Sequence, residues 1–294
     1  MCPANPSDYS SGYPSGYSGD YSGDYSALDR PPLRADALRR GLVRPGGLWR
    51  EIRVVSETGS TNADVVAESR TGAAEGLVLV AESQTVGRGR LGRTWSTPPR
   101  SGLLFSALLR PAPAVPPGRW GWLPLLAGVA VAAAVRRLAG VEAALKWPND
   151  VLVGSRKLAG ILVERAGQAM VVGVGLNVSA RADELPVSTA TSLLIEGART
   201  TDRDPLLRAA LRELATRYGA WRAVGGDPDA GVGGGLRGAY RELSATLGRE
   251  VAVALPGGGD VRGTALDVDG DGRLLVAGPL GTVAVAAGDV VHVR

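Results

Sequence analysis

The stretch GRGRLGRTW, Gly87–Trp95, decides how the rest of the chain is interpreted. It follows the apolar run GLVLVAE (76–82), and its first six residues fit the G-x-G-x-x-G pattern of dinucleotide-binding folds. That pattern requires a helix to begin at once, so that the pyrophosphate meets the helix N-terminus. Here Pro98 and Pro99 follow instead, and the acidic residue expected about 20 positions on is missing. The stretch is therefore not a Rossmann fingerprint.

What remains is a glycine-rich loop that carries Arg88, Arg90 and Arg93. Its glycines suit a loop that is mobile when empty and closes over a ligand. Guanidinium groups bind carboxylate and phosphate oxygens in pairs, and Trp95 offers a flat face for an aromatic ring. The loop predicts a lid that brings a carboxylate and a nucleotide phosphate together. An RNA-binding loop of the RGR type is the less favoured alternative.

The basic residues point to two special positions. Of 33 Lys and Arg residues only two are lysines, Lys146 and Lys157, and both lie in motifs discussed below. A lysine retained in such an arginine-rich chain indicates a site that needs a compact ammonium acting as a point charge. The net charge of +4 permits an anionic partner, but the basic residues are spread out and form no block typical of nucleic-acid tails.

Composition excludes several classes of function. The length of 294 residues, with 45% hydrophobic and 21% charged residues, is typical of a soluble protein with one large or two unequal domains. The single cysteine, Cys2, allows no disulfide within the chain and favours a reducing cytoplasm. The single histidine, His292, lies in an alternating strand, so histidine-based hydrolysis and histidine-rich metal sites are poorly supported; we expect no metal site. The apolar run Leu123–Val135 is too short for a membrane span and predicts a buried helix.

The N-terminal part of the chain has low complexity. Residues 1 to about 27 repeat Tyr among Ser, Gly and Asp, with no secretory signal, which predicts a passive disordered tail. We place this tail at residues 1–45, with a short helix at Leu33–Gly41 before the folded part begins near Leu48. No helix-turn-helix fits ahead of that point, so no N-terminal DNA-binding domain is expected.

From Ile52 the pattern alternates between strands and helices. Strands are predicted at 51–57, 76–82, 142–147, 157–165 and 169–178, and helices at 61–69, 123–138 and 204–221. Ser60 or Thr61 is the expected N-cap of the first helix, with Asp64 completing a capping box. After Leu247, short alternating runs at 249–255, 261–269, 274–279 and 282–293 predict a small β-barrel. Asp267, Asp269 and Asp271 resemble the start of an EF-hand, but Gly278 occupies the twelfth position, so a hairpin turn is predicted there.

The motifs together resemble those of biotin protein ligases. GRGRLGRTW is joined by KWPND at 146–150, KLAGILVE at 157–164 and GVGLNV at 173–178, in the family's order and spacing, and STN (60–62) and ESQ (82–84) add two weaker matches. The resemblance covers residues 50 to 294. It implies an α+β fold like that of class II aminoacyl-tRNA synthetases, a mixed sheet with helices at 46–246, followed by an SH3-like β-barrel at 247–294.

The same resemblance implies an activity. The family activates biotin with ATP to biotinyl-5′-AMP, with Mg²⁺ carried by ATP and pyrophosphate, and then transfers biotin to one lysine of a carboxyl carrier domain. The acceptor implied here is a biotin carboxyl carrier domain of an acyl-CoA or pyruvate carboxylase, with no DNA or membrane partner. The first step brings a carboxylate onto an anionic nucleotide, so fixed cations are needed.

Roles for single residues follow from the resemblance. Lys157 is the expected central cation, which contacts the biotin carboxylate and then polarises the acyl carbonyl, and Arg90 assists it in catalysis. The residues implied for biotin are Ser60, Thr61, Asn62, Gln84, Arg88, Gly89, Arg90, Lys157 and Gly160. Those implied for ATP are Arg90, Arg93, Trp95, Lys146, Asn149, Asp150, Lys157 and Asn177.

Rival interpretations remain open at this point. A lipoate or octanoate ligase of the same superfamily is disfavoured by the GRGRxGR and KWPND forms. A biotin-sensing repressor that binds DNA is disfavoured because no N-terminal DNA-binding domain is expected. A catalytically idle biotin-binding protein is disfavoured because it would not need both lysines and all three lid arginines. Val86 departs from the smaller residue that often precedes GRGR in the family, and we expect it to alter lid closure slightly.

Overall fold

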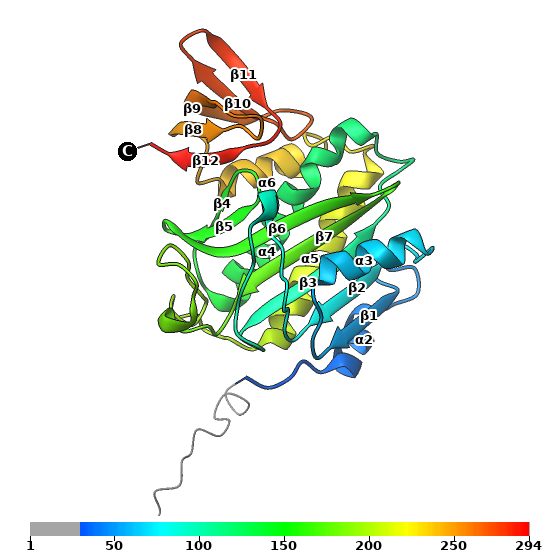
Figure 1. Ribbon diagram of the computed structural model, residues 1–294. Coiled ribbons are helices and arrows are strands. Elements are labelled where there is room, and N and C mark those ends of the chain that lie inside the picture. The colour runs from blue at the N-terminus through cyan, green and yellow to red at the C-terminus, as the bar shows by residue number, and fades with distance from the viewer. Residues whose placement is uncertain (1–29, 294) are drawn as a thin grey trace, which may run out of the picture. The chain divides into compact units, whose positions relative to one another are not determined.

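The computed structural model describes residues 30–293, so the predicted low-complexity tail at 1–27 lies outside the described residues. From Pro32 onward the chain forms one compact unit built on a seven-stranded sheet and a five-stranded sheet (Figure 1).

The larger sheet is mixed, as predicted. Its order is β1-β2-β3-β7-β6-β5-β4, in which β1 and β2 pair in parallel and all other neighbours are antiparallel. The strands are β1 (Glu51–Val55), β2 (Leu77–Ala81), β3 (Gly102–Leu109), β4 (Ala143–Lys146), β5 (Asp150–Val153), β6 (Arg156–Ala166) and β7 (Ala169–Asn177). Strands β3 and β5 were not predicted, although β3 is buried along its whole length and pairs with both β2 and β7.

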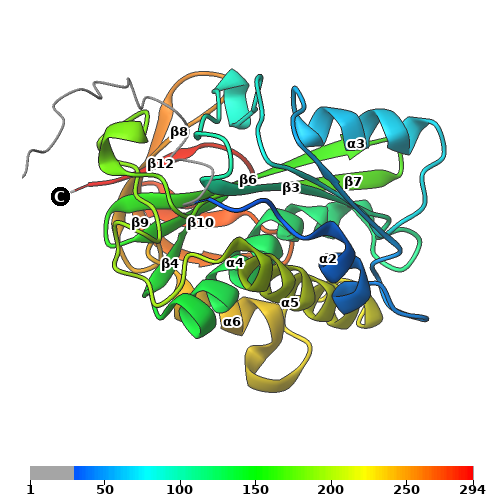
Figure 2. The same ribbon diagram turned by 90° about the horizontal axis from the view of Figure 1, so that it is seen from below.

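Helices cover both faces of this sheet. They are α2 (Ala35–Leu42), α3 (Thr61–Arg70), α4 (Trp122–Ala139), α5 (Arg203–Ala223) and α6 (Gly235–Leu243). Figure 2 shows α2, α4, α5 and α6 on one face and α3 on the other. The segment Pro117–Ala139 is long and apolar enough to cross a membrane, but 72% of its most apolar window is buried inside the fold. It is therefore the core helix that the sequence predicts.

The N-terminal boundary of the folded part needs a correction. Helix α2 matches the predicted short helix, but it packs against α5 and β1, with Leu38 and Leu42 buried. The Arg39 side chain also donates a hydrogen bond to the Ile52 carbonyl at 2.9 Å. The disordered tail predicted for residues 1–45 therefore extends too far, because the apolar face of this helix is part of the core.

The predicted capping box at the start of α3 does not form. Ser60 occupies the N-cap position with extended backbone, but its side chain makes no capping hydrogen bond. Asp64 instead accepts a hydrogen bond from the Thr58 hydroxyl, which lies before the helix. The Ser60 hydroxyl is consequently left to face the pocket described below.

The smaller sheet is antiparallel, with the order β11-β10-β9-β8-β12. Its strands are β8 (Glu250–Ala254), β9 (Asp260–Val268), β10 (Leu274–Gly278), β11 (Gly281–Val285) and β12 (Asp289–His292). The run 282–293, predicted as one strand, is divided at the turn before Asp289 into the two strands that form opposite edges of the sheet. The aspartates resembling an EF-hand form the predicted hairpin turn, in which Asp269 Oδ1 accepts the backbone N–H groups of Asp271 and Arg273 at 2.9 and 3.0 Å.

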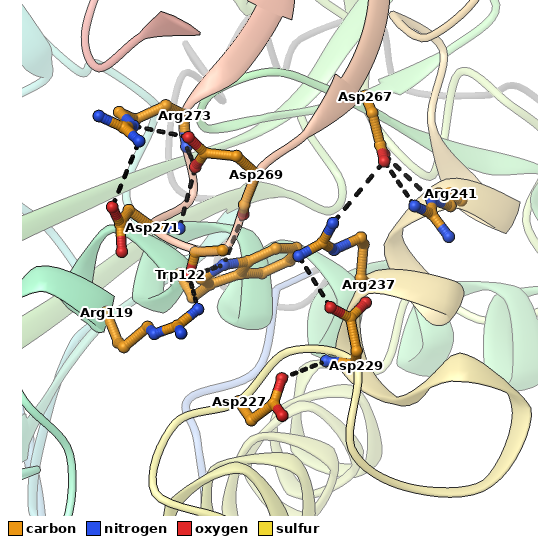
Figure 3. A network of polar contacts seen from close by, with 11 residues as sticks. Arg119, Trp122, Asp227, Asp229, Arg237, Arg241, Asp267, Asp269, Asp271 and Arg273 are labelled. Carbon is orange, nitrogen blue, oxygen red and sulfur yellow. Dashed lines mark hydrogen bonds and ion pairs between the residues drawn. The ribbon is translucent and has the colours of Figure 1, made fainter.

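That hairpin turn attaches the smaller sheet to the helices (Figure 3). Trp122 Nε1 donates to the carbonyls of Asp269 and Gly270 at 3.1 Å, and Arg119 donates to Gly270 at 2.6 Å. On α6, Arg241 forms an ion pair with Asp267. These contacts join β9 and its turn to the start of α4 and to α6, so the smaller sheet is held to the helices by directed bonds in addition to apolar packing.

A buried ion pair between Arg203 and Glu82 allows a stability prediction. Arg203 Nη1 lies 2.6 Å from Glu82 Oε2, and both side chains are buried. Glu82 also accepts the Leu33 backbone N–H at 2.6 Å. We expect Arg203→Met to lower the free energy of unfolding by about 3 kcal/mol, because it leaves a buried carboxylate without its cation. Urea denaturation measures the free energy of unfolding. Arg262, which forms an exposed ion pair with Asp260, offers the control: Arg262→Met should change the free energy of unfolding by less than about 0.5 kcal/mol.

Candidate functional site

A pocket opens between the start of α3, the lid and the strands β6 and β7. Six of the residues predicted for biotin and one predicted for ATP line it, together with five further residues of the two strands: Ser60, Thr61, Asn62, Gln84, Arg88, Trp95, Gly160, Ile161, Leu162, Gly173, Val174 and Gly175. The prediction placed most of these residues in separate motifs. The fold brings them together because Gln84, which follows β2, lies beside the start of α3.

The orientation of Gln84 is determined by its neighbour. Gln84 Oε1 accepts two hydrogen bonds from Thr61, one from the backbone N–H at 2.8 Å and one from the hydroxyl at 3.0 Å. This identifies the oxygen end of the amide, so the two N–H donors of Gln84 are left for a ligand. A carbonyl-type oxygen is the group that such donors recognise.

Asn62 lines the pocket, and its side-chain amide is bonded within the protein. Its amide nitrogen donates to the Leu162 carbonyl at 3.2 Å and to Glu164 Oε2 at 2.7 Å, which uses both N–H donors. Its oxygen accepts from the Ser106 hydroxyl at 2.6 Å. Asn62 therefore builds the floor of the pocket, and Ser106 and Glu164 are supporting residues that the sequence did not reveal.

Glycines on β6 and β7 make room for the floor and for Trp95. A Cβ atom at Gly173 would lie 2.1 Å from Asn62 Oδ1, and one at Gly175 would lie 2.4 Å from Trp95 Cε2. At Gly160 a Cβ atom would lie 3.0 Å from the Trp95 ring. Trp95 Nε1 is buried and has no hydrogen-bond partner among the described residues. The indole therefore rests on the strands through close contact with glycine, with its one polar atom unsatisfied.

A cluster of charged side chains lies beside the pocket. Lys157 Nζ is 2.6 Å from Asp150 Oδ1 and 5.8 Å from the centroid of the Trp95 ring. The segment 189–191 holds the Lys157 backbone, since the Lys157 N–H donates to the Thr189 carbonyl at 2.7 Å and its carbonyl accepts from the Thr191 N–H at 2.8 Å. The ammonium is thus placed between the pocket and the KWPND motif by a rigid strand.

Arg90 connects the lid to the same cluster. Its Nη1 donates to Asn149 Oδ1 at 3.0 Å and to the Gly288 carbonyl at 3.3 Å. Asn149 is oriented in turn, because its Nδ2 donates to the Ile161 carbonyl at 2.9 Å. Burial lowers the pKa of Arg90, and the nearby Arg93 adds to this, whereas Asp289 and Asp150 oppose it. The half-buried guanidinium is a strong donor for an anionic ligand.

The lid itself is a short hairpin. The Trp95 N–H donates to the Gly87 carbonyl at 2.9 Å, and the Gly89 N–H donates to the Arg93 carbonyl at 2.7 Å. Leu91 and Gly92 at its tip have positive φ angles of 55° and 73°. Arg93 does not join the Asn149 cluster; it forms an ion pair with Asp289 at the start of β12. That the lid moves when ligands bind stays a prediction.

The remaining two predicted residues lie at the ends of strands. Lys146 ends β4, where it is the register partner of Asp150. Asn177 ends β7; it is buried, its Nδ2 donates to the Thr191 carbonyl at 2.9 Å, and its Oδ1 has no hydrogen-bond partner among the described residues. Within residues 30–293, no group of three or more His, Cys, Asp or Glu residues could hold a metal ion.

Comparison with known proteins identifies the same two regions. The family described as "Biotin/lipoate A/B protein ligase family" matches residues 54–179, and the "Biotin protein ligase C terminal domain" matches residues 246–293.

Relatives match over most of the chain. It is 46% identical to the biotin–[acetyl-CoA-carboxylase] ligase of Mycobacterium tuberculosis, over 90% of this chain and 97% of the relative. Identity to the bifunctional ligase/repressor BirA of Escherichia coli is 30%, over 79% of this chain and 70% of the relative. The biotin protein ligase of Aquifex aeolicus in complex with biotin and ATP has a similar structure, with a TM-score of 0.70, 28% identity and coverage of 84% of this chain and 100% of that one.

Proposed function

The chain belongs to the biotin protein ligase family, and from this premise we propose that its pocket and charged cluster make biotinyl-5′-AMP from biotin and ATP. A biotin carboxylate oxygen bonds to the α-phosphorus of ATP, and the bond to pyrophosphate breaks. The ε-amine of an acceptor lysine then attacks the acyl carbonyl, loses a proton and releases AMP. The protein is thus an ATP-dependent ligase.

One observation carries this proposal. The pocket and the charged cluster share a wall, because Trp95 lines the pocket while Lys157 Nζ stands 5.8 Å from the centroid of its ring. A ligand whose polar ring occupies the pocket would direct its other end toward Lys157 and Arg90. This is the arrangement required when a carboxylate must meet a phosphate.

On the biotin side, the residues differ in whether their polar groups remain available for a ligand. Gln84 offers its two N–H donors and Ser60 its hydroxyl, which suit the oxygen of a ureido ring. Thr61 and Asn62 support these groups, since Thr61 fixes Gln84 and both Asn62 donors bind the protein. Arg88, Gly89 and Gly160 form the wall and the lid side.

On the ATP side, the proposal assigns the phosphates to cations. Lys157 bonds to the carboxylate and the α-phosphate oxygens, exchanging its ion pair with Asp150 for the substrates. Arg90 and Lys146 contact the other phosphates, with Arg93 at the rim, while Trp95 meets the adenine, and Asn149 and Asn177 shape the nucleotide side. Mg²⁺ enters with ATP as part of the substrate, and Asp150 is the carboxylate proposed to face it.

The acceptor and the domain limits are proposed from the same relatives. The name of the mycobacterial relative specifies acetyl-CoA carboxylase, which supports a biotin carboxyl carrier domain of an acyl-CoA carboxylase, and a pyruvate carboxylase remains a second candidate. We assign catalysis to the part that runs from α2 to residue 246, and the small sheet from 247 onward to a C-terminal domain. The cytoplasm is proposed as the location.

The test is ATP–pyrophosphate exchange by the purified protein with biotin, lipoate, octanoate or no acid. We expect exchange that requires biotin. Exchange that requires lipoate or octanoate would move the protein to the other branch of the superfamily. A folded protein that binds biotin without exchange would overturn the enzymatic assignment.

The glycines under Trp95 lead to a separate prediction. Gly175→Ala places a methyl group where Trp95 Cε2 lies 2.4 Å away, so the indole must leave its position over β7. We expect the Kd for biotin to rise about 30-fold, which corresponds to a loss of about 2 kcal/mol of binding free energy. Isothermal titration calorimetry measures this. Gly219→Ala on α5 is the control, because its Cβ meets nothing within 4 Å, and it should leave the Kd unchanged.

A further inference from the structure

The last strand brings the chain's one histidine beneath the KWPND motif. His292 on β12 has its Nε2 atom 3.3 Å from Thr246 Oγ1. Thr246 is fully buried between α6 and β8, and the same Oγ1 accepts the Trp147 backbone N–H at 3.1 Å. A chain of hydrogen bonds therefore runs from the C-terminal sheet to the residue that follows Lys146.

The direction of the first bond is fixed, because a backbone N–H can only donate, so Thr246 Oγ1 accepts from Trp147. In the second bond the donor depends on the histidine tautomer, and the Thr246 hydrogen is available for His292 Nε2. Nε2 accepts only when the imidazole is neutral with its proton on Nδ1. A protonated ring would have to donate instead, and the buried Thr246 hydrogen would then lose its acceptor.

The charges around His292 also favour the neutral imidazole. Burial lowers the pKa of His292, and the cations Lys146 on β4 and Arg249 before β8 lower it further. The neighbouring carboxylate of Glu250 accepts a hydrogen bond from the Thr264 hydroxyl on β9. The ring is therefore neutral at pH 7, and protonation at lower pH would add a third positive charge beside Lys146 and Arg249.

We propose that His292 is a positioning residue for the ATP-dependent half of the reaction. Its neutral imidazole accepts the Thr246 hydrogen, and Thr246 in turn holds the backbone at Lys146 and Trp147. The proposal rests on the function given above, since it takes Lys146 as a phosphate contact. His292 itself touches no substrate. Its protonation loosens the backbone that carries Lys146, so ATP binding weakens as the pH falls while biotin binding does not.

The experiment measures biotin-dependent ATP–pyrophosphate exchange from about pH 8 down to about pH 5.5, a range that includes the titration of histidine. In the wild-type protein we expect the KM for ATP to rise about fivefold over this range, the size expected for one buried hydrogen bond. The KM for biotin should change by less than about twofold over the same range.

Two variants separate positioning from a merely structural role. In His292→Gln an amide oxygen can accept the Thr246 hydrogen at every pH, so the KM for ATP should match that of the wild type at pH 8 and should not rise on acidification. Thr246→Val keeps the shape of the side chain but breaks the chain of bonds, so the KM for ATP should be raised at every pH.

Different failures have different meanings. If His292→Gln keeps the wild-type rise in the KM for ATP, or if the KM for biotin rises in parallel, the role of His292 is refuted while the ligase function stands. An unchanged KM for ATP in Thr246→Val refutes it as well. If the wild-type protein shows no biotin-dependent exchange at any pH, the proposed function fails, and this inference fails with it.

Discussion

Lys157→Met is expected to lower the rate of biotinyl-5′-AMP formation about 1,000-fold or more, because it removes the fixed positive charge at which the carboxylate and the α-phosphate meet. Methionine keeps most of the apolar stem and removes the ammonium group that lies over the Trp95 ring, so the fold should remain intact. Single-turnover formation of the adenylate in a quenched-flow experiment measures this. Binding of biotin should weaken far less than the chemical step slows.

A matched control lies next to it on the same strand. Arg156 is also a cation at the start of β6, but it forms an ion pair with Glu196 at 2.7 Å and lies outside the pocket. Arg156→Met should leave the rate within about twofold. Near wild-type turnover in Lys157→Met would show that Lys157 is not the central cation.

Arg90→Gly is expected to have the second large effect, on retention of the intermediate. Arg90 connects the lid to Asn149 and to the Gly288 carbonyl, so its removal breaks the bonds of the lid to the KWPND motif and to Gly288. We expect the adenylate to dissociate about 100-fold faster, in line with the loss of more than one charge-assisted hydrogen bond. Biotinylation of lysines on a bystander protein such as serum albumin, followed by streptavidin blotting, measures the escape.

Arg93→Gly provides the comparison, since the Arg93 side chain is exposed and pairs with Asp289, and among the described residues it has no bond to Asn149. Its effect on escape should be several-fold smaller. If Arg90→Gly biotinylated only the carrier domain, the stretch Gly87–Trp95 would not be a lid over the intermediate.

Most of the fold could be predicted because its elements have clear periods. Helices α4 and α5 and strands β1, β2, β6 and β7 lie within a few residues of the predicted ranges. Strand β3 was missed because it is buried on both faces, so its sequence GLLFSALL shows a continuous apolar run without alternation. Helix α6 was missed because its start is rich in glycine, and only Leu236 and Tyr240 are buried at helical spacing.

The site was predictable to the extent that its residues belong to contiguous motifs. Contacts between distant segments could not be predicted from the sequence. Gly288 and Asp289 are separated by nearly 200 positions along the chain from the lid arginines that contact them. The protein partners of Asn62 were missed for the same reason, since Ser106 and Glu164 come from two other strands. The glycines of GVGLNV were visible at alternate positions, a signal of close approach on one face of a strand.

The resting place of Trp95 has a spectroscopic consequence. Of the six tryptophans, the other five, at positions 49, 120, 122, 147 and 221, are all buried in the core, and Trp95 alone is partly open to solvent. A small quencher such as acrylamide therefore reaches chiefly this one indole, and a ligand that covers it shields the emission. The intrinsic fluorescence of the unlabelled protein thus reports on occupancy of the pocket, without any probe attached to the lid.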